Sequence, residues 1–232
     1  VTCVNLVDDK GDPIFAPGAT APVTDADGNT LFNLTVMGVA TPETQTKANP
    51  ALMKGLTFLS GQKLYDAANA KIKVAREEGN ADIVIALTHL GVDASSEPNR
   101  SIDFVKNVPG VDIVIDGHSH TVMANKQVTD ASGKAVTLTQ TGSYFKNIGK
   151  MTVGADGTIT TELINTYEGL DAAVAATASN WISAVDDMLG EEIAVGDTKF
   201  YINDPATGKR RIRSGETNLG DFVADGIYTY FN

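Results

Sequence analysis

The chain has 232 residues, a length that allows one large domain or a domain and a half. Apolar residues make up 42% of it, enough to form a buried core, and acids outnumber bases by 29 to 18, which gives a net charge of -11. This acidity argues against nonspecific binding to nucleic acid. The single cysteine, Cys3, excludes an internal disulfide, and no apolar run approaches the length of a membrane span.

The first 60 residues predict short strands and turns. Residues 2–7 are expected to form a strand, and the run Thr-Asp-Ala-Asp-Gly-Asn at 24–29 leads into a second β-rich segment at 30–40. That run resembles the start of a calcium loop but lacks the closing glutamate at the required spacing, so we interpret it as a hairpin turn. Residues 41–61 are expected to form a loop.

A strand–helix–strand unit is predicted in the middle of the chain. The alanine-rich residues 65–78 favour a helix that Gly79 and Asn80 end. The continuous apolar runs at 83–87 and 113–115 indicate strands buried on both faces, and a shorter helix at 101–106 connects them. Such a unit with short connections predicts that its two strands are parallel.

More β structure is expected after this unit. Residues 136–141 are expected to form a strand, and residues 150–153 and 158–164 to form a hairpin around Ala-Asp-Gly at 155–157.

The chain changes character after Glu191, which follows a long predicted helix. An amphipathic helix is predicted at 170–189, where Gly190 stops it, followed by a strand near Phe200 and a helix at 217–231. The basic residues at 209–213 follow a turn signal, so we interpret them as the return arm of an exposed hairpin and not as a nucleic-acid patch.

All three histidines stand at the ends of predicted strands. His89 ends the first buried run, and His118 and His120 follow the second in Gly-His-Ser-His. Ligands of open α/β sheets bind beyond the carboxyl ends of the strands, and neighbouring strands lie about 4.8 Å apart, so His89 and His118 can meet at one ion. Gly117 is expected to turn the backbone before His118. His118 and His120 would point to the same side if that stretch stays extended.

This pattern favours a metal site over three ordinary loop histidines, because imidazole is a good ligand for zinc, manganese, iron and nickel. Three imidazoles alone make an incomplete site, since a two-metal phosphoesterase also needs a bridging carboxylate and further ligands. Asp116 is the nearest acid in the sequence. We interpret it as a structural residue or as one that supports the ligands from behind.

Two segments resemble the last two motifs of the calcineurin-like metallophosphoesterases, namely Leu-Thr-His-Leu-Gly at 87–91 and Asp-Ile-Val-Ile-Asp-Gly-His-Ser-His at 112–120. Segments 38–43, 141–150 and 213–225 narrow the resemblance to the bacterial 5'-nucleotidase and 2',3'-cyclic-nucleotide phosphodiesterase family. The matches run in order along nearly the whole chain.

The resemblance implies hydrolysis of nucleotide 5'-monophosphates or 2',3'-cyclic nucleotides by two divalent metals, zinc or manganese. His89 and His118 would bind one ion and His120 the other, and the ions would hold the phosphate and activate a water.

The resemblance also implies a fold and a division of the chain. Residues 1–168 would be the C-terminal half of a four-layer α/β/β/α metallophosphoesterase domain. Residues 169–190 would be a linker helix, and residues 191–232 the start of a second, α+β domain. By resemblance and acidity, the parent protein is expected outside the cytoplasm, in the periplasm, secreted or on the cell surface.

The family's first three motifs, Asp-x-His, Gly-Asp-x-x and Gly-Asn-His-Asp/Glu, would precede all the segments matched here. The chain has no Gly-Asn-His, and its one Asp-x-His at 116–118 belongs to a late motif. The catalytic histidine is therefore expected before Val1, and this chain alone is expected to be inactive. The alternatives are a non-catalytic metal-binding or assembly module that keeps only three histidines, and an N-terminal piece that stays bound and completes the site. Loss of half of a β core also predicts self-association through the uncovered face.

Overall fold

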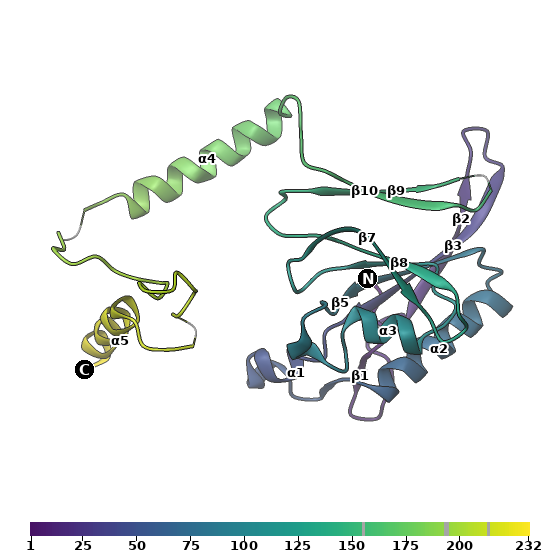
Figure 1. Ribbon diagram of the computed structural model, residues 1–232, viewed down its shortest axis with the longest axis horizontal. Helices are drawn as coiled ribbons and strands as arrows, with labels where there is room; N and C mark the ends of the chain where they lie inside the picture. The colour runs from purple at the N-terminus through teal and green to yellow at the C-terminus, as the bar shows by residue number, and fades with distance from the viewer. Residues whose placement is uncertain (155, 193–194, 213) are drawn as a thin grey trace. The chain divides into compact units, whose positions relative to one another are not determined.

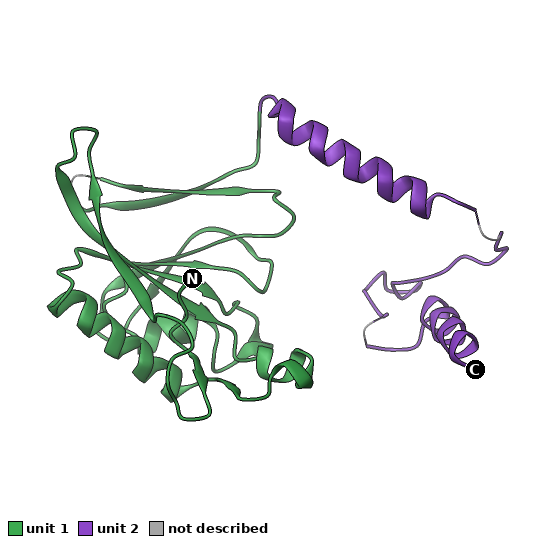
Figure 2. Ribbon diagram, turned by 180° about the vertical axis from the view of Figure 1, so that it is seen from behind, with its two compact units in different colours: residues 1–167 green, residues 168–232 purple. Residues whose placement is uncertain are grey.

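The computed structural model describes residues 1–154, 156–192, 195–212 and 214–232, and the chain forms two compact units, 1–167 and 168–232 (Figure 2). The first unit is mixed α/β, which confirms the predicted fold class. It carries all three histidines, so its sheet decides where the candidate site lies.

A six-stranded sheet organises the first unit (Figure 1). In spatial order its strands are β2 (Gly18–Thr24), β3 (Thr30–Ala40), β5 (Ile83–His89), β6 (Ile113–Asp116), β8 (Ala135–Thr141) and β7 (Val122–Thr129). The four central strands are parallel, and the two edge strands pair antiparallel to them. The predicted parallel pairing of β5 with β6 is confirmed.

Helices α2 (Gln62–Glu77) and α3 (Ser101–Asn107) pack against one face of this sheet. Leu64 of α2 and Phe104 of α3 are fully buried, in one core with Val84 and Ala86 of β5. Because side chains alternate along a strand, the next set in β5, Ile83 and those two and four positions on, faces the opposite side of the sheet.

That opposite face is covered in part by an antiparallel hairpin, β9 (Ile148–Val153) and β10 (Ile159–Ile164). Its apolar side chains pack on Ile83 and Ile85. The cover does not reach Leu87, which is 51% exposed, so the prediction that 83–87 is buried on both faces is wrong at its last residue. The predicted hairpin of 150–153 and 158–164 is confirmed, while Ala155 of its predicted turn lies outside the described residues.

The region before α2 contains more structure than the sequence predicted. The expected strand at 2–7 begins later, as β1 (Leu6–Asp8), and pairs antiparallel with β4 (Leu56–Phe58). Between β3 and α2 lie the short helices α1 (Thr44–Lys47) and η1 (Pro50–Leu52), in a segment expected to be a loop. Elements of three or four residues are too short to show a hydrophobic period.

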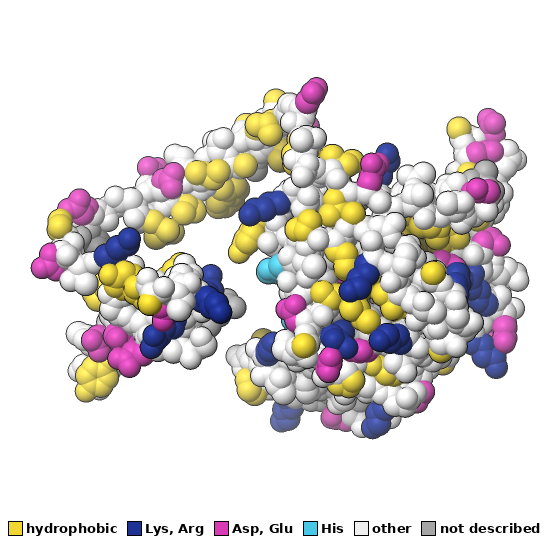
Figure 3. Space-filling view, viewed as in Figure 1, with side chains coloured by type: hydrophobic (Ala, Val, Ile, Leu, Met, Phe, Trp, Pro, Cys, Tyr) yellow, Lys and Arg dark blue, Asp and Glu magenta, His cyan; other side chains and the backbone are white. Residues whose placement is uncertain are grey.

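The second unit contains α4 (Ala172–Leu189), which ends at Gly190 as predicted, and α5 (Asn218–Phe231), which Thr217 caps. Neither helix buries a residue, and apolar side chains gather along α4 (Figure 3). In the described part of this unit no strand forms near Phe200; only Asn203 and Arg210 make an antiparallel bridge. Arg213 of the basic run lies outside the described residues.

No helix in the described part of the chain is both long and apolar enough to cross a membrane.

Candidate metal centre

Two histidines meet at the carboxyl edge of the parallel sheet. His89 is the last residue of β5, and His118 lies two residues beyond the end of the neighbouring β6. Their ring centroids are 5.2 Å apart, with an interplanar angle of 62°. The prediction that adjacent strand ends bring these two imidazoles together is confirmed, at the edge where open α/β sheets bind ligands.

Two glycines allow the rings to pack closely against the backbone. A Cβ on Gly117 would lie 2.9 Å from Nδ1 of His89, and a Cβ on Gly91 would lie 3.1 Å from Cδ2 of His118. Any side chain at Gly117 would therefore displace the His89 ring. Glycine is required at position 117 because the His89 ring approaches it closely, and not because the backbone turns there.

The turn occurs instead at the histidines themselves. His118 has a φ of 80° and His120 a φ of 55°, in the left-handed region that non-glycine residues seldom adopt. The backbone N–H of Ser119 donates to the carbonyl of Gly117 at 3.1 Å, which closes a tight turn around His118. The extended stretch on which a common side for His118 and His120 depended is therefore not present, and His120 is exposed.

Asp116 is buried at the end of β6 and is saturated with hydrogen bonds. Its Oδ1 accepts from Thr88 Oγ1 at 2.7 Å and from the backbone N–H groups of Leu90 and Gly91 at 2.9 and 3.3 Å. Its Oδ2 accepts from Nε2 of Gln140 at 3.0 Å. This carboxylate thus ties the loop that follows His89 to the sheet, a geometry that favours a structural role over metal ligation.

Gln140 of β8 extends this support to the loop that carries the other two histidines. Its Oε1 accepts from the backbone N–H of Thr121 at 2.6 Å and from Oγ of Ser119 at 3.1 Å. Both histidine loops are consequently held to the sheet through one buried pair, Asp116 and Gln140.

Glu43 is a member of the site that sequence reasoning missed. Its Oε2 lies 3.1 Å from Nε2 of His118, although the two residues are 75 positions apart in the chain. Oε1 accepts from Oγ of Ser96, and Lys47 pairs with Oε2. These contacts with Lys47, Ser96 and His118 lower the pKa of Glu43 to about 2, against the opposing effect of burial.

A signal for Glu43 exists in the sequence. The residue comes three positions after the end of β3, and β3 is the parallel neighbour of β5. Its place in the chain therefore puts it at the same sheet edge as His89.

Burial, together with the neighbouring His118 and His120, lowers the pKa of the His89 imidazole below its ordinary value, and Asp116 acts in the opposite direction. The lowered pKa favours the neutral ring, the form that binds a metal.

The donor set fits a metal in part. His89 and His118 can supply two imidazole ligands to one ion, and in the described residues Nδ1 of His118 has no hydrogen-bond partner. No group of three or more His, Cys, Asp or Glu side chains placed to hold an ion occurs in the part of the chain that the structure describes. A catalytic zinc site keeps three protein ligands, so these two histidines make an incomplete set.

No protein-family model matches the chain. In sequence it is 27% identical to the trifunctional nucleotide phosphoesterase protein YfkN of Bacillus subtilis. The alignment spans 215 residues, which are 88% of this chain and 13% of that protein. The chain is 31% identical over 136 residues to the 2',3'-cyclic-nucleotide 2'-phosphodiesterase/3'-nucleotidase of Salmonella typhimurium, covering 56% of this chain and 20% of that enzyme. The chain thus spans a minor part of the length of both relatives.

Solved structures share its fold. The calcineurin-like phosphoesterase YfkN matches with a TM-score of 0.59 at 19% identity, over 82% of this chain and 64% of that one. The sulfate thiohydrolase SoxB of Thermus thermophilus matches with a TM-score of 0.65, also at 19% identity, over 99% of this chain and 39% of that one. At this identity the likeness concerns the fold alone.

Proposed function

We propose that the whole protein is a metal-dependent hydrolase of nucleotide phosphate esters. The proposal is supported by the sequence similarity to a nucleotide phosphoesterase and to a 2',3'-cyclic-nucleotide 2'-phosphodiesterase/3'-nucleotidase, and by the fold shared with a calcineurin-like phosphoesterase. One observation carries the proposal: the imidazoles of His89 and His118 lie 5.2 Å apart, centroid to centroid, at the carboxyl edge of the parallel sheet. The substrates proposed are nucleotide 5'-monophosphates and 2',3'-cyclic nucleotides.

The proposed roles divide the three histidines between two ions. His89 and His118 lie close enough to share one divalent cation, zinc or manganese, whereas the exposed His120 would serve the second. A cation bound there would supply a Lewis acid for the phosphate and lower the pKa of a water. Asp116 would keep the loops of His89 and His118 in register through its hydrogen bonds to backbone and to Gln140.

We propose that these 232 residues alone turn over nucleotides very slowly. They contain no Gly-Asn-His segment, and so they lack the catalytic histidine that the resemblance places in that motif. Among the described residues no group of three or more His, Cys, Asp or Glu could hold an ion, and Asp116 is already occupied by four donors.

The test is the metal content of the purified chain beside that of His118→Ala, with Glu162→Gln as a control. The exposed side chain of Glu162 pairs with Lys150 across the β9–β10 hairpin, so the control should keep the metal of the parent chain. We expect His118→Ala to lose most of the zinc or manganese. Equal metal content in all three proteins would contradict the proposed site.

A hydrolysis assay with AMP and with 2',3'-cyclic AMP, each with manganese or zinc added, tests the activity. We expect little turnover by this chain and turnover by a longer protein that carries the early motifs. Rapid turnover by the 232 residues would overturn the claim that they are inactive alone.

A second candidate is a non-catalytic metal-binding or assembly module, which is favoured by the absence of a three-ligand cluster among the described residues. The coding sequence discriminates between the two. Asp-x-His and Gly-Asn-His segments upstream of Val1 would favour the enzyme, and their absence would favour the module.

We further propose that the protein acts outside the cytoplasm. This proposal rests on the family resemblance and the net charge of -11, and a fusion of the full coding sequence to a periplasmic reporter tests it.

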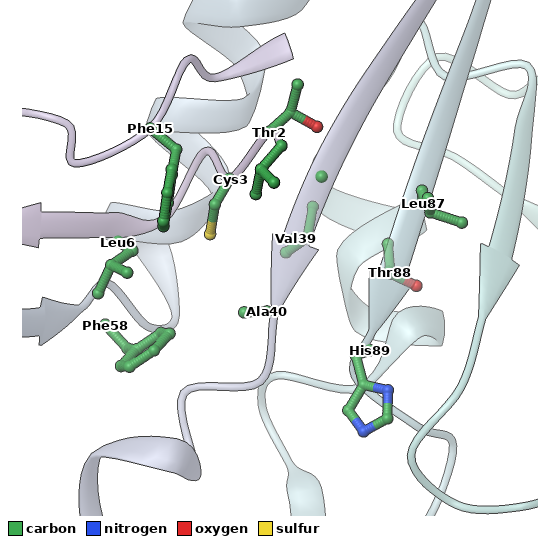
Figure 4. A pocket seen from close by; sticks show the side chains of 12 residues that line it. Thr2, Cys3, Leu6, Phe15, Val39, Ala40, Phe58, Leu87, Thr88 and His89 are labelled. Carbon is green, nitrogen blue, oxygen red and sulfur yellow. The ribbon is translucent and has the colours of Figure 1, made fainter.

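We also propose that the uncovered β face associates with a second copy of the chain. This proposal rests on a hollow of about 710 Å³ whose lining includes Phe15, Phe58 and Leu87 (Figure 4).

A further inference from the structure

We infer that Glu43 is a positioning residue of the metal centre: it accepts a hydrogen bond from Nε2 of His118 and leaves Nδ1 of that ring for the metal. The inference deepens the proposed function and rests on it. It assigns a role to a residue that the resemblance did not single out and that lies 75 positions from its partner.

The first step is the chemistry of the contact. At neutral pH a glutamate carboxylate has no proton to donate, so the 3.1 Å contact with Nε2 requires that this nitrogen carries the hydrogen. In a neutral imidazole the other nitrogen then holds the free lone pair. The hydrogen bond to Glu43 thus selects the tautomer of His118 whose Nδ1 can bind a cation.

The second step is that Glu43 is itself held in place. Its side chain is 18% exposed, and its carboxylate contacts three side chains, Lys47, Ser96 and His118. Ser96, which donates to Oε1, is buried in the short helix η2 (Ala94–Ser96). A carboxylate with this many partners fixes the ring that it touches, whereas a free surface glutamate would not.

The third step is the position of these contacts in the fold. Glu43 follows β3, Ser96 follows β5 and His118 follows β6, and these are three neighbouring parallel strands. One carboxylate therefore joins the three loops at the carboxyl edge of the sheet. Metal-bound histidines commonly donate their second ring N–H to a carboxylate, and loss of such a partner typically weakens metal binding by about 10- to 100-fold.

The first measurement needs no metal. In the chelator-treated, ¹⁵N-labelled chain, we expect the Nε2–H of His118 to give a slowly exchanging proton signal, assigned by its loss in His118→Ala. Glu43→Ala should remove the signal, Glu43→Gln should retain it in weakened form because the amide oxygen still accepts, and the control Glu162→Gln should leave it unchanged. Absence of the signal from the parent chain, or its persistence in Glu43→Ala, would overturn the inference.

The second measurement is the zinc affinity of the same proteins. We expect a loss of about 10- to 100-fold in Glu43→Ala and a smaller loss in Glu43→Gln. If His118→Ala loses zinc but Glu43→Ala stays within about twofold of the parent chain, the role of Glu43 is refuted and the proposed metal site stands. If His118→Ala binds zinc as the parent chain does, the proposed site is refuted as well.

Discussion

The imidazole of His89 links the candidate centre to the stability of the chain. Burial, His118 and His120 hold its pKa below the ordinary value of 6.5 in the folded protein. As the pH falls below 6.5, the unfolded chain takes up this proton before the folded chain does. The free energy of unfolding should therefore decrease from pH 6.5 downward through the lowered pKa, and it should show no contribution from His89 above 6.5.

We expect His89→Gln to flatten that part of the profile. Urea unfolding of both proteins between about pH 5 and about pH 8 gives the two curves, and the difference between them isolates the contribution of His89. Two parallel curves would show that protonation of His89 is not coupled to folding.

Gly117 offers a test of how closely the His89 ring must be held. A methyl group at this position would lie 2.9 Å from Nδ1, so Gly117→Ala should displace the His89 ring from its place beside His118. We expect zinc affinity to fall by about tenfold, the lower end of the effect of disturbing the supports of a ligand. Gly226→Ala is the matched control, because a Cβ there meets no atom within 4 Å. An unchanged affinity in Gly117→Ala would mean that His89 is not a ligand.

At the scale of single residues, the sequence predicted that His89 and His118 lie close together, but it did not predict the backbone conformation at His118. The meeting of His89 and His118 follows from the parallel pairing of two apolar runs, which is a local and periodic signal. The left-handed φ of His118 depends on a loop held by Gln140, a contact across 19 to 21 positions that leaves no pattern in the chain. The contact with Glu43, across 75 positions, was missed because Glu43 is placed at the edge beside His89 only once β3 is known to pair in parallel with β5.

Asp116 at the end of β6 binds Thr88 and Leu90 at the end of β5, so its replacement should destabilise both strand ends. Asp116→Ala would leave the buried N–H of Leu90 and the hydroxyl of Thr88 without their acceptor. An unsatisfied buried donor costs about 1–3 kcal/mol, so we expect the free energy of unfolding to fall by about 3 kcal/mol or more.

Urea unfolding measures this loss, with Asp27→Ala as the control. Asp27 is an exposed residue of the β2–β3 turn, and its replacement should change the free energy of unfolding by less than about 0.5 kcal/mol. A cost for Asp116→Ala as small as that of the control would mean that another donor set holds the loops.

Whole elements were predicted where the hydrophobic pattern was long enough. Helices α2, α4 and α5 have fourteen or more residues each, and all three were predicted to within three residues of their bounds. The edge strands β2 and β7 were missed, because most of their side chains are exposed and neither shows the apolar run of a buried strand. A strand was predicted near Phe200, but the described part of that segment has no neighbouring strand with which to pair.

In the first unit as a whole, the incomplete set of metal ligands and the uncovered part of the sheet lie at the same end of β5. The hairpin β9–β10 covers Ile83 and Ile85, and the cover ends where β5 continues to Leu87 and His89. The register of β3 with β5 places Gly38 beside Leu87 and Ala40 beside His89. The backbone of Thr2 packs on Gly38, whereas Leu87 stays half exposed at this end of the face. Partners that would complete the site and partners that would cover apolar surface have to approach the same end of the sheet.

Leu87→Lys tests whether that end of the face binds a second copy. Leu87 is 51% exposed, so the substitution should leave the free energy of unfolding nearly unchanged while it places a charge in the contact. We expect the parent chain to self-associate with rising concentration in analytical ultracentrifugation and Leu87→Lys to stay monomeric. Leu52→Lys, at a residue that is 74% exposed in η1, should associate as the parent chain does. A parent chain that stays monomeric at high concentration, or equal association of both variants, would place the apolar end of β5 outside any contact between copies.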